Sequence, residues 1–293
     1  MNASQRRSQV LARPEEVAER LGQPGMVLIE VDDRPELYAL GHPPGARLMN
    51  WREDLQDPVR RDLPSAGAIK KLWARLGVRS GSDVVLYGDL NNWLAAYAYW
   101  VFRSYGLTGV RLLDGGRQAW VAEGRPLTTD TPPAPGGGDV PDPVFTADWR
   151  ADRTDVIRAA HAGALLDART PQEYTGEWLT EPQFPGEAAH RAGHIPGATS
   201  LPWEDAVGLD GYLKPLEVLQ QQYATAGLHH DLPIVTYCRI GERSAHTWIV
   251  LHELLDYPRV RNYDGSWTEW GSMTRMPIQL GHDRGLMSAE FTA

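Results

Sequence analysis

The sequence predicts an α/β protein made of two similar domains, each a parallel β-sheet with helices on both faces. A chain of 293 residues with 42% hydrophobic content is long enough for two domains of ordinary size. Short apolar runs rich in β-branched residues alternate with helical patterns, as parallel sheets require. The run 233–237 is apolar throughout instead of alternating, which indicates a strand covered on both faces.

An internal repeat predicts the domain organisation. The same succession of motifs occurs twice, and from Val84 onward the two copies keep a constant offset of 150 residues. The corresponding segments are 28–30 and 165–167, 44–46 and 196–198, 84–87 and 234–237, 114–115 and 264–265, and Trp120 and Trp270. Between the copies, residues 126–143 are too rich in proline and glycine for a helix or a central strand. We therefore predict domains at 1–125 and 144–293, joined by a linker at 126–143.

Each predicted strand of the pair 84–87 and 234–237 is followed by a helical pattern, over 93–105 in the first repeat and 245–255 in the second. Active sites of open α/β sheets lie beyond the carboxyl ends of the strands. The one cysteine of the chain, Cys238, stands at such an end. In the first repeat its counterpart is Gly88, so the first domain has no nucleophile there and is expected to be inactive.

A single cysteine excludes an internal disulfide and argues against a dithiol redox motif or a cysteine-based zinc site. Between a strand and a helix, Cys238 would face unpaired backbone N–H groups and the positive end of a helix dipole, both of which favour a thiolate. The alternative is a small buried thiol without chemistry. Two flanking arginines and a glycine, Arg239, Arg243 and Gly241, favour the nucleophile.

Charge and hydropathy limit the partners. The net charge is −9, and 20 acidic against 12 basic residues follow position 143. Such a surface repels phosphate backbones, so we expect no nucleic acid partner. No apolar run approaches the ~20 residues of a membrane span, and the polar start of the chain lacks a secretory signal, so we expect a cytoplasmic protein that binds no membrane. No long apolar stripe indicates an oligomer, and a monomer is the expected state.

The duplicated motifs resemble the two-domain rhodaneses over nearly the whole chain. The loop Cys-Arg-Ile-Gly-Glu-Arg at 238–243 and the segment 262–270 are similar to bacterial thiosulfate sulfurtransferases in particular. The resemblance implies an inactive first domain, a catalytic second domain and a Cys238 that cycles through a persulfide. It implies thiosulfate as the small-molecule sulfur donor, sulfite as the product, and cyanide or a thiol as the acceptor. No cofactor is implied.

The loop residues Arg239, Ile240, Gly241, Glu242 and Arg243 are the expected substrate-binding residues. Sulfur transfer needs a thiolate, a cradle for the persulfide and positive charge for the departing anion. The two arginines could hold thiosulfate and sulfite through charge-assisted hydrogen bonds, and Gly241 would let the loop curl around the sulfur. The arginines could instead be solvated or ion-paired. We expect Glu242 to point outward or to pair with one of them.

Other residues carry weaker signals. Trp93 and Trp203 could line a cleft, although core packing is the better expectation for each. His194 is expected to be a structural hydrogen-bonding histidine, and Asp167 and Arg169 are expected to form an ion pair that stabilises a loop. Between the strand-end and Pro-Gly-Ala motifs the second repeat holds about fifteen extra residues, which in the family border the active site. No His, Asp or Glu cluster has metal-ligand spacing, so no metal is expected.

Three alternatives remain. A cysteine phosphatase of related fold needs five residues between cysteine and arginine to fit phosphate, and this loop has four. Mercaptopyruvate sulfurtransferases usually carry glycine directly after the cysteine, where this chain has Arg239. A non-catalytic rhodanese-like module would be expected to lack the cysteine altogether. The sequence therefore predicts a thiosulfate sulfurtransferase.

Overall fold

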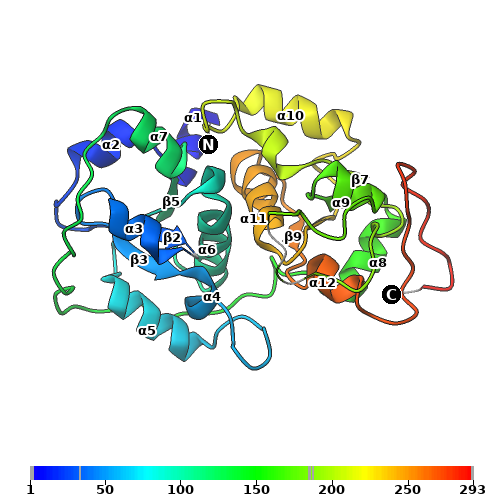
Figure 1. The fold of residues 1–293 in the computed structure, drawn as a ribbon, viewed down its shortest axis with the longest axis horizontal. Coiled ribbons are helices and arrows are strands. Elements are labelled where there is room, and N and C mark those ends of the chain that lie inside the picture. The colour runs from blue at the N-terminus through cyan, green and yellow to red at the C-terminus, as the bar shows by residue number, and fades with distance from the viewer. Residues whose placement is uncertain (1–2, 33, 184–185, 187, 292–293) are drawn as a thin grey trace. The chain divides into compact units, whose positions relative to one another are not determined.

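The computed structural model describes residues 3–32, 34–183, 186 and 188–291. The chain divides into two compact units, one of residues 1–146 with 208–213 and the other of residues 147–207 with 214–293. The first unit runs mostly from blue to green and the second from green to red in Figure 1.

The first unit is built on a sheet of parallel strands in the order β1-β5-β4-β2-β3. The strands are β1 (Leu11–Ala12), β2 (Met26–Asp32), β3 (Arg47–Asn50), β4 (Asp83–Tyr87) and β5 (Val110–Leu113). The helices are α1 (Ala3–Val10), α2 (Pro14–Glu19), α3 (Pro35–Leu40), α4 (Trp51–Asp54), α5 (Ala66–Leu76), the 3-10 turn η1 (Leu90–Asn92), α6 (Trp93–Ser104) and α7 (Gly116–Ala122).

The second unit repeats the core of this sheet with the order β7-β6-β8-β9, again parallel throughout. Its strands are β6 (Leu165–Asp167), β7 (Thr199–Ser200), β8 (Ile234–Tyr237) and β9 (Val260–Asn262). Its helices are α8 (Arg153–His161), α9 (Pro171–Thr175), the 3-10 turn η2 (Trp203–Ala206), α10 (Leu216–Thr225), α11 (Glu242–Trp248), the π-helical turn η3 (Ile249–Leu254) and α12 (Ser266–Trp270). A parallel bridge between Arg150 and Asn262 stands where β1 pairs with β5 in the first unit.

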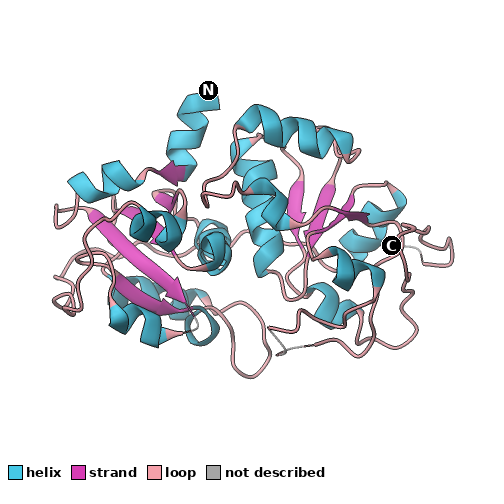
Figure 2. Cartoon of the chain, turned by 45° about the horizontal axis from the view of Figure 1, so that its top comes forward, coloured by secondary structure: helices cyan, strands magenta, loops and turns pink. Residues whose placement is uncertain are grey.

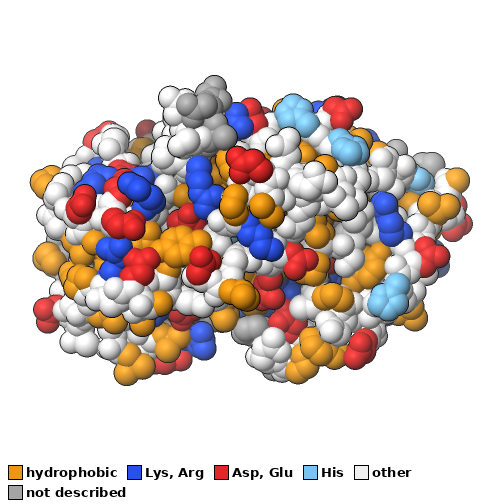
Figure 3. Space-filling model, turned by 90° about the horizontal axis from the view of Figure 1, so that it is seen from above, with side chains coloured by type: hydrophobic (Ala, Val, Ile, Leu, Met, Phe, Trp, Pro, Cys, Tyr) orange, Lys and Arg blue, Asp and Glu red, His pale blue; other side chains and the backbone are white. Residues whose placement is uncertain are grey.

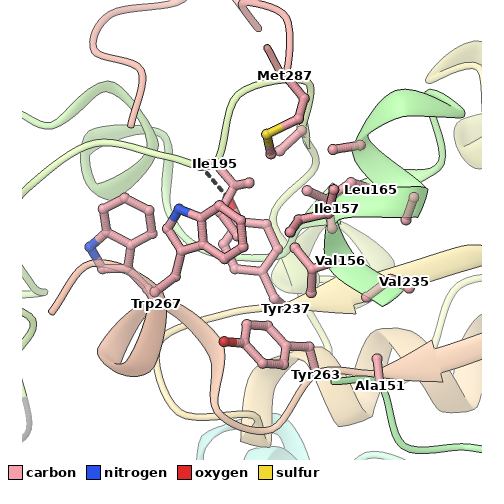
Figure 4. Packing of buried hydrophobic residues seen from close by; sticks show 14 of the residues in the cluster. Ala151, Val156, Ile157, Leu165, Ile195, Val235, Tyr237, Tyr263, Trp267 and Met287 are labelled. Carbon is pink, nitrogen blue, oxygen red and sulfur yellow. Dashed lines mark hydrogen bonds between the residues drawn. The ribbon is translucent and has the colours of Figure 1, made fainter. Parts of the chain in front are cut away.

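Both sheets are covered on their two faces, as the uninterrupted apolar strands predicted (Figure 2). All four residues of β8 are buried. Tyr237 and Val235 face a cluster formed with α8 and α12, where Tyr237, Trp267 and Val156 pack together (Figure 4). The intervening residues of β8 lie on the opposite face, and α11 packs against this strand and β9. The α/β prediction with helices on both faces is therefore confirmed.

The helices that follow the central strands differ slightly from the predicted ranges. The first, α6, ends one residue earlier than expected, at Ser104. In the second unit the helix begins at Glu242, three residues before the predicted start, and continues through a π-helical turn to Leu254. The apolar periodicity missed this first turn because its Glu242, Arg243 and Ser244 are polar, although all three are buried.

The segment 126–143 packs against the surface of the first unit and is held there by hydrogen bonds. Thr128 exchanges backbone hydrogen bonds with His42, at 2.8 and 2.9 Å. Farther along, the Ser80 N–H donates to Asp139 O, and an Arg47 guanidinium nitrogen donates to Pro133 O. Its prolines and glycines suit an extended path whose backbone groups are satisfied by the domain surface.

Residues 208–213 also belong to the first unit, which the sequence pattern did not indicate. The Leu213 N–H donates to Asp114 Oδ1 at 3.1 Å, and Arg7 donates to Leu213 O at 2.8 Å. Arg7 in turn forms an ion pair with Asp114 at 2.8 Å. These contacts join residues about a hundred or more positions apart, so no local pattern could predict them.

The repeat extends to single side chains. His194 stacks on Tyr174 with ring centres 3.6 Å apart, and its Nδ1 lies 2.8 Å from Tyr174 O. In the first unit His42 stacks on Tyr38 at 3.7 Å, with Nδ1 2.9 Å from Tyr38 O. Both histidines stand two residues before a Pro-Gly-Ala motif. The prediction that His194 is structural agrees with these contacts.

On the face drawn in Figure 3, lysine and arginine side chains are interspersed with aspartate and glutamate. Among the residues that the structure describes, no helix has the length and apolar composition that crossing a bilayer requires.

The first unit cannot accept a side chain where the second carries its cysteine. A Cβ atom added to Gly88 would lie 2.6 Å from the backbone oxygen of Val31. We predict that Gly88→Ala destabilises the protein by about 1–3 kcal/mol, because this backbone cannot move without disturbing β2. Urea denaturation measures the loss. Gly137→Ala is the control, since open space surrounds Gly137, and equal stability of the two variants would refute the steric explanation.

Candidate active site

The loop between β8 and α11 is held by the turn that follows β9. The Cys238 N–H donates to Ser266 Oγ at 3.1 Å, and Cys238 O accepts from the Trp267 N–H at 3.0 Å. Arg239 O accepts from both the N–H and the hydroxyl of Thr268, at 3.0 and 2.9 Å. The motif before the tryptophan-bearing helix therefore clamps the backbone of the cysteine loop.

Gly241 is required by the close approach of two loops. Its φ is +99°, and a Cβ there would lie 2.6 Å from the Cα atom of Asp264. Its carbonyl oxygen lies 3.0 Å from Asn262 Nδ2 and 3.1 Å from Ser244 Oγ. Its N–H donates to Cys238 Sγ at 3.2 Å. This geometry agrees with the predicted curl of the loop around the sulfur.

The Cys238 thiol is fully buried, and its surroundings differ from the expected anion-favouring site. Burial raises the pKa of the Cys238 thiol, and the Glu242 carboxylate raises it further, while Arg243 and hydrogen bonding to Ser244 act in the opposite direction. The sequence argument counted the backbone N–H groups but not the loss of water or the glutamate. The surroundings of Cys238 therefore favour the protonated thiol over the thiolate.

Glu242 points inward. Its side chain is 1% exposed, with Oε2 3.6 Å from Cys238 Sγ and Oε1 3.6 Å from Arg239 Nη2. Of the two expected arrangements, the outward one is wrong and pairing with an arginine is the one observed. The reason is that Glu242 is the first residue of α11, whose start is enclosed by the loop.

Arg243 lies between two carboxylates. Its guanidinium forms two hydrogen bonds with Glu173, at 2.7 and 3.0 Å, and a further ion pair with Glu181. Burial alone would raise the pKa of Glu173, but Arg243 prevails and lowers it to about 2. Burial raises the pKa of Glu181, and the nearby Glu173 and Glu204 add to this effect against Arg243. Two carboxylates thus compensate the charge expected to bind the anion.

The insertion of the second repeat borders this loop. Besides Glu181 it supplies Thr180, whose Oγ1 lies 3.2 Å from Arg239 Nη1. Arg239 is 8% exposed, so it is neither a solvated surface arginine nor fully enclosed. Glu173 and Glu181 were missed as site residues. A signal was present for Glu173, because Thr170 and Glu173 form a capping-box pattern that places this glutamate on the first turn of α9.

A second buried ion pair supports the strands beneath the loop. Arg169 Nη2 lies 2.6 Å from Asp167 Oδ2, and Tyr237 donates to the same oxygen at 2.6 Å. The Arg169 guanidinium covers the Trp267 ring, 4.6 Å from its centre. Asp167 and Arg169 are therefore mutual partners at the strand end, as expected, and they anchor the aromatic cluster in Figure 4.

The remaining predicted residues are buried. Ile240 is 3% exposed, and Trp93 and Trp203 are 5% and 4% exposed, as core packing requires and unlike an exposed aromatic lip. Trp203 meets His246 edge to face at 5.1 Å. Burial lowers the pKa of His246 to about 4, so this histidine is neutral near pH 7. Within the described ranges, no group of three or more His, Cys, Asp or Glu side chains is arranged to hold a metal.

Fold and site define a two-domain protein with one cysteine-bearing strand-end loop, and comparison with known proteins agrees. The family described as "Rhodanese-like domain" matches residues 13–123 and 151–273. The chain belongs to this family.

Two relatives match along almost their full length. The chain is 49% identical over 280 residues to the "Sulfur carrier protein TtuD" of Thermus thermophilus, covering 94% of this chain and 98% of the relative. It is 45% identical to the "Putative thiosulfate sulfurtransferase 1" of Mycobacterium bovis, covering 94% and 99%. Among solved structures, an anaerobic ergothioneine biosynthesis enzyme from Chlorobium limicola superposes with a TM-score of 0.80 at 21% identity, covering 94% of this chain and 71% of that one. This last likeness shows the fold alone.

Removing the Arg243 guanidinium should leave two buried carboxylates without a partner. We predict that Arg243→Met destabilises the protein by about 3–5 kcal/mol in urea denaturation, whereas Arg259→Met, at an exposed position, changes stability by less than about 0.5 kcal/mol. Adding Glu173→Gln to Arg243→Met should recover part of the loss. Equal stability of the two arginine variants would show that this ion-pair cluster does not hold the loop.

The same ion pair predicts a dependence of stability on pH. The folded-state pKa of Glu173 is about 2, below its ordinary value of 4.5, so its stabilising contribution is complete above about pH 4.5 and is lost as pH falls toward 2. Glu173→Gln should therefore cost about 2–4 kcal/mol at neutral pH, and the gap from the wild type should narrow on acidification. Urea denaturation across this range measures it, and a constant gap would contradict the prediction.

Proposed function

We propose that this sulfurtransferase of the rhodanese family takes sulfane sulfur from thiosulfate, holds it as a Cys238 persulfide and passes it to cyanide or a thiol. The two chains named above lend support, since one bears a thiosulfate sulfurtransferase name and the other a sulfur carrier name. The proposal assigns catalysis to the second domain, 144–293, and a structural role to 1–125, where Gly88 replaces the cysteine.

One observation carries the proposal. Cys238 Sγ lies inside the closed loop 238–243, where the Gly241 N–H donates to it at 3.2 Å. Because the chain has no other cysteine, sulfur must be held on this atom alone. A persulfide is the form in which one thiol carries a second sulfur through two half-reactions.

The first half-reaction conserves charge and needs no cofactor. The Cys238 thiolate attacks the outer sulfur of thiosulfate and forms a new S–S bond. The bond between the outer sulfur and the sulfonate sulfur breaks, and its electron pair leaves with sulfite. Cys238 becomes a persulfide anion, and sulfite takes up the proton that the resting thiol released. One enzyme thiol and one thiosulfate dianion thus yield one enzyme perthiolate and one hydrogen sulfite anion.

Arg239 is the stronger candidate for binding the anion. Its guanidinium lies 3.6 Å from the Glu242 carboxylate, whereas the Arg243 guanidinium lies 2.7 Å from Glu173. Arg243 acts on the sulfur through its charge, which lowers the pKa of the Cys238 thiol while Glu173 and Glu181 hold its guanidinium. Ile240 and Gly241 complete the cradle around the sulfur.

The loop also favours thiosulfate over two other substrates. Mercaptopyruvate enzymes usually have glycine after the cysteine, whereas Arg239 stands here. Phosphatases of related fold need five residues between cysteine and arginine, and only four separate Cys238 from Arg243. Steady-state assays with thiosulfate, mercaptopyruvate and an aryl phosphate should rank the substrates in that order, and faster phosphate release would reverse the assignment.

The decisive test is direct detection of the persulfide. After incubation with thiosulfate, intact mass spectrometry should show one added sulfur atom on the wild type, and cyanide should remove it. Cys238→Ser should gain none, while Ser288→Ala, at an exposed position far from the loop in sequence, should load like the wild type. Uptake of sulfur by Cys238→Ser would end the mechanism.

A further inference from the structure

The sulfur-transfer scheme leaves one group at the reacting atom without a role. Glu242 Oε2 lies 3.6 Å from Cys238 Sγ, and the carboxylate is buried with the thiol. A buried carboxylate is costly unless it is paired or bonded. Near an enzyme nucleophile it also opposes the negative charge that the reaction needs, so its presence calls for a reason.

Ion pairing accounts poorly for Glu242. Among the residues that the structure describes, Arg239 and Arg243 face Glu242, Glu173 and Glu181, and Glu204 acts on Glu181 from η2. Asp264, which pairs with Arg150, lies beside Gly241. Arg243 is compensated by Glu173 and Glu181, so Glu242 is left with Arg239. That contact, at 3.6 Å, is longer than a charge-assisted hydrogen bond. The thiol is the other partner of this carboxylate, at the same distance.

Loop structure accounts for Glu242 no better, as the first unit shows. With the offset of 150, the counterpart of Glu242 is Asn92, in the loop where Gly88 replaces the cysteine. Asn92 Oδ1 accepts from the Gly88 N–H at 3.0 Å, and Nδ2 donates to Leu113 O at 2.6 Å. A neutral amide thus holds the loop that lacks a thiol, and the carboxylate occurs in the loop that has one.

We propose that Glu242 is a catalytic base that removes the proton of a thiol acceptor and then returns it to Cys238, which makes the second half-reaction selective for thiols. This inference rests on the persulfide cycle proposed above and names its acceptor class. A carboxylate that exchanges protons with the cysteine sulfur needs to be in contact with it, and Oε2 is in that position.

The steps balance as follows. Glu242 takes the proton of the acceptor thiol, and the resulting thiolate forms a bond to the outer sulfur of the Cys238 persulfide. The S–S bond to Sγ breaks, and its electron pair stays on Sγ as a thiolate. The proton then moves from Glu242 to Sγ. One thiol and one enzyme perthiolate yield one acceptor perthiolate and the resting enzyme thiol.

Loading from thiosulfate removes no proton from the incoming molecule, because thiosulfate carries none, and the proton of the resting Cys238 thiol leaves with sulfite as hydrogen sulfite. Glu242 also raises the pKa of the Cys238 thiol, so its neutralisation favours the thiolate that attacks the donor. The two half-reactions should therefore respond in opposite ways to loss of the carboxylate. A purely structural glutamate would affect both alike.

The test compares Glu242→Gln, Glu242→Asp and the wild type, with Glu217→Gln as an exposed control on α10. Each protein is loaded with thiosulfate, freed of excess donor and mixed with glutathione or with sulfite, and decay of the persulfide is followed by intact mass. At about pH 7.5 we expect Glu242→Gln to pass sulfur to glutathione about tenfold more slowly than the wild type, with transfer to sulfite changed by less than about twofold. Loading should be as fast or faster.

The pH dependence of sulfur transfer distinguishes a proton-accepting role of Glu242 from a purely structural one. The deficit of Glu242→Gln should shrink as pH rises past about 8.5, where a cysteine-type thiol ionises without help. Glu242→Asp keeps a carboxylate but shortens its reach, so it should fall between the wild type and Glu242→Gln with glutathione and match both with sulfite. Glu217→Gln should match the wild type throughout.

The outcomes distinguish this inference from the proposed function. If neither the wild type nor Glu217→Gln takes up sulfur from thiosulfate, the persulfide cycle itself is wrong. If they load but Glu242→Gln transfers sulfur to glutathione as fast as the wild type at every pH, the assignment of Glu242 as a base is overturned. Equal slowing with glutathione and sulfite also overturns it. Should Glu242→Gln fail to fold, equal slowing of both acceptors by Glu242→Asp has the same meaning.

Discussion

The burial of Arg243 between Glu173 and Glu181 is the constraint on which the site depends. These ion pairs join the start of α11 to two neighbouring segments about sixty to seventy residues earlier in the chain, the start of α9 and the insertion of the second repeat. Removing one member of a buried cluster leaves uncompensated charge, which is more costly than the cluster is favourable. The segments that Arg243 holds together also carry Thr180, which contacts Arg239, and Glu242, which contacts the sulfur.

Charge compensation also affects the protonation of the Cys238 thiol. Considered alone, a loop with two arginines would indicate an anion-binding site in which the pKa of the cysteine thiol is lowered. In the folded protein the carboxylates of Glu173, Glu181 and Glu242 lie against these two arginines. Burial and Glu242 raise the pKa of the Cys238 thiol. The resting site therefore favours the protonated thiol. Formation of the thiolate requires a proton acceptor or a bound substrate that stabilises the negative charge.

Comparison of the two units shows how one loop design serves two purposes. In the first unit Gly88 has no room for a side chain, and Asn92 satisfies the backbone around it. In the second unit Ser266 and Asn262 perform comparable tasks from β9 and the turn after it, which leaves Glu242 to contact the thiol. The stacked His–Tyr pairs retained in both units hold the first-strand loops, whereas the cysteine loops have diverged.

The sequence by itself determined the duplication, the parallel sheets and the family, because each depends on local patterns or on a register kept along the chain. The start of the helix at Glu242 was not predicted from the sequence, because residues 242–244 are polar although they form a buried turn. Only the tertiary structure decided that Glu242 points inward, that Glu173 and Glu181 neutralise Arg243, and that Trp93 and Trp203 are buried. The ion pairs of Arg243 join residues about sixty or more positions apart, and the burial of Glu242 and of the two tryptophans depends on the exclusion of water by the whole domain, so local spacing predicts neither.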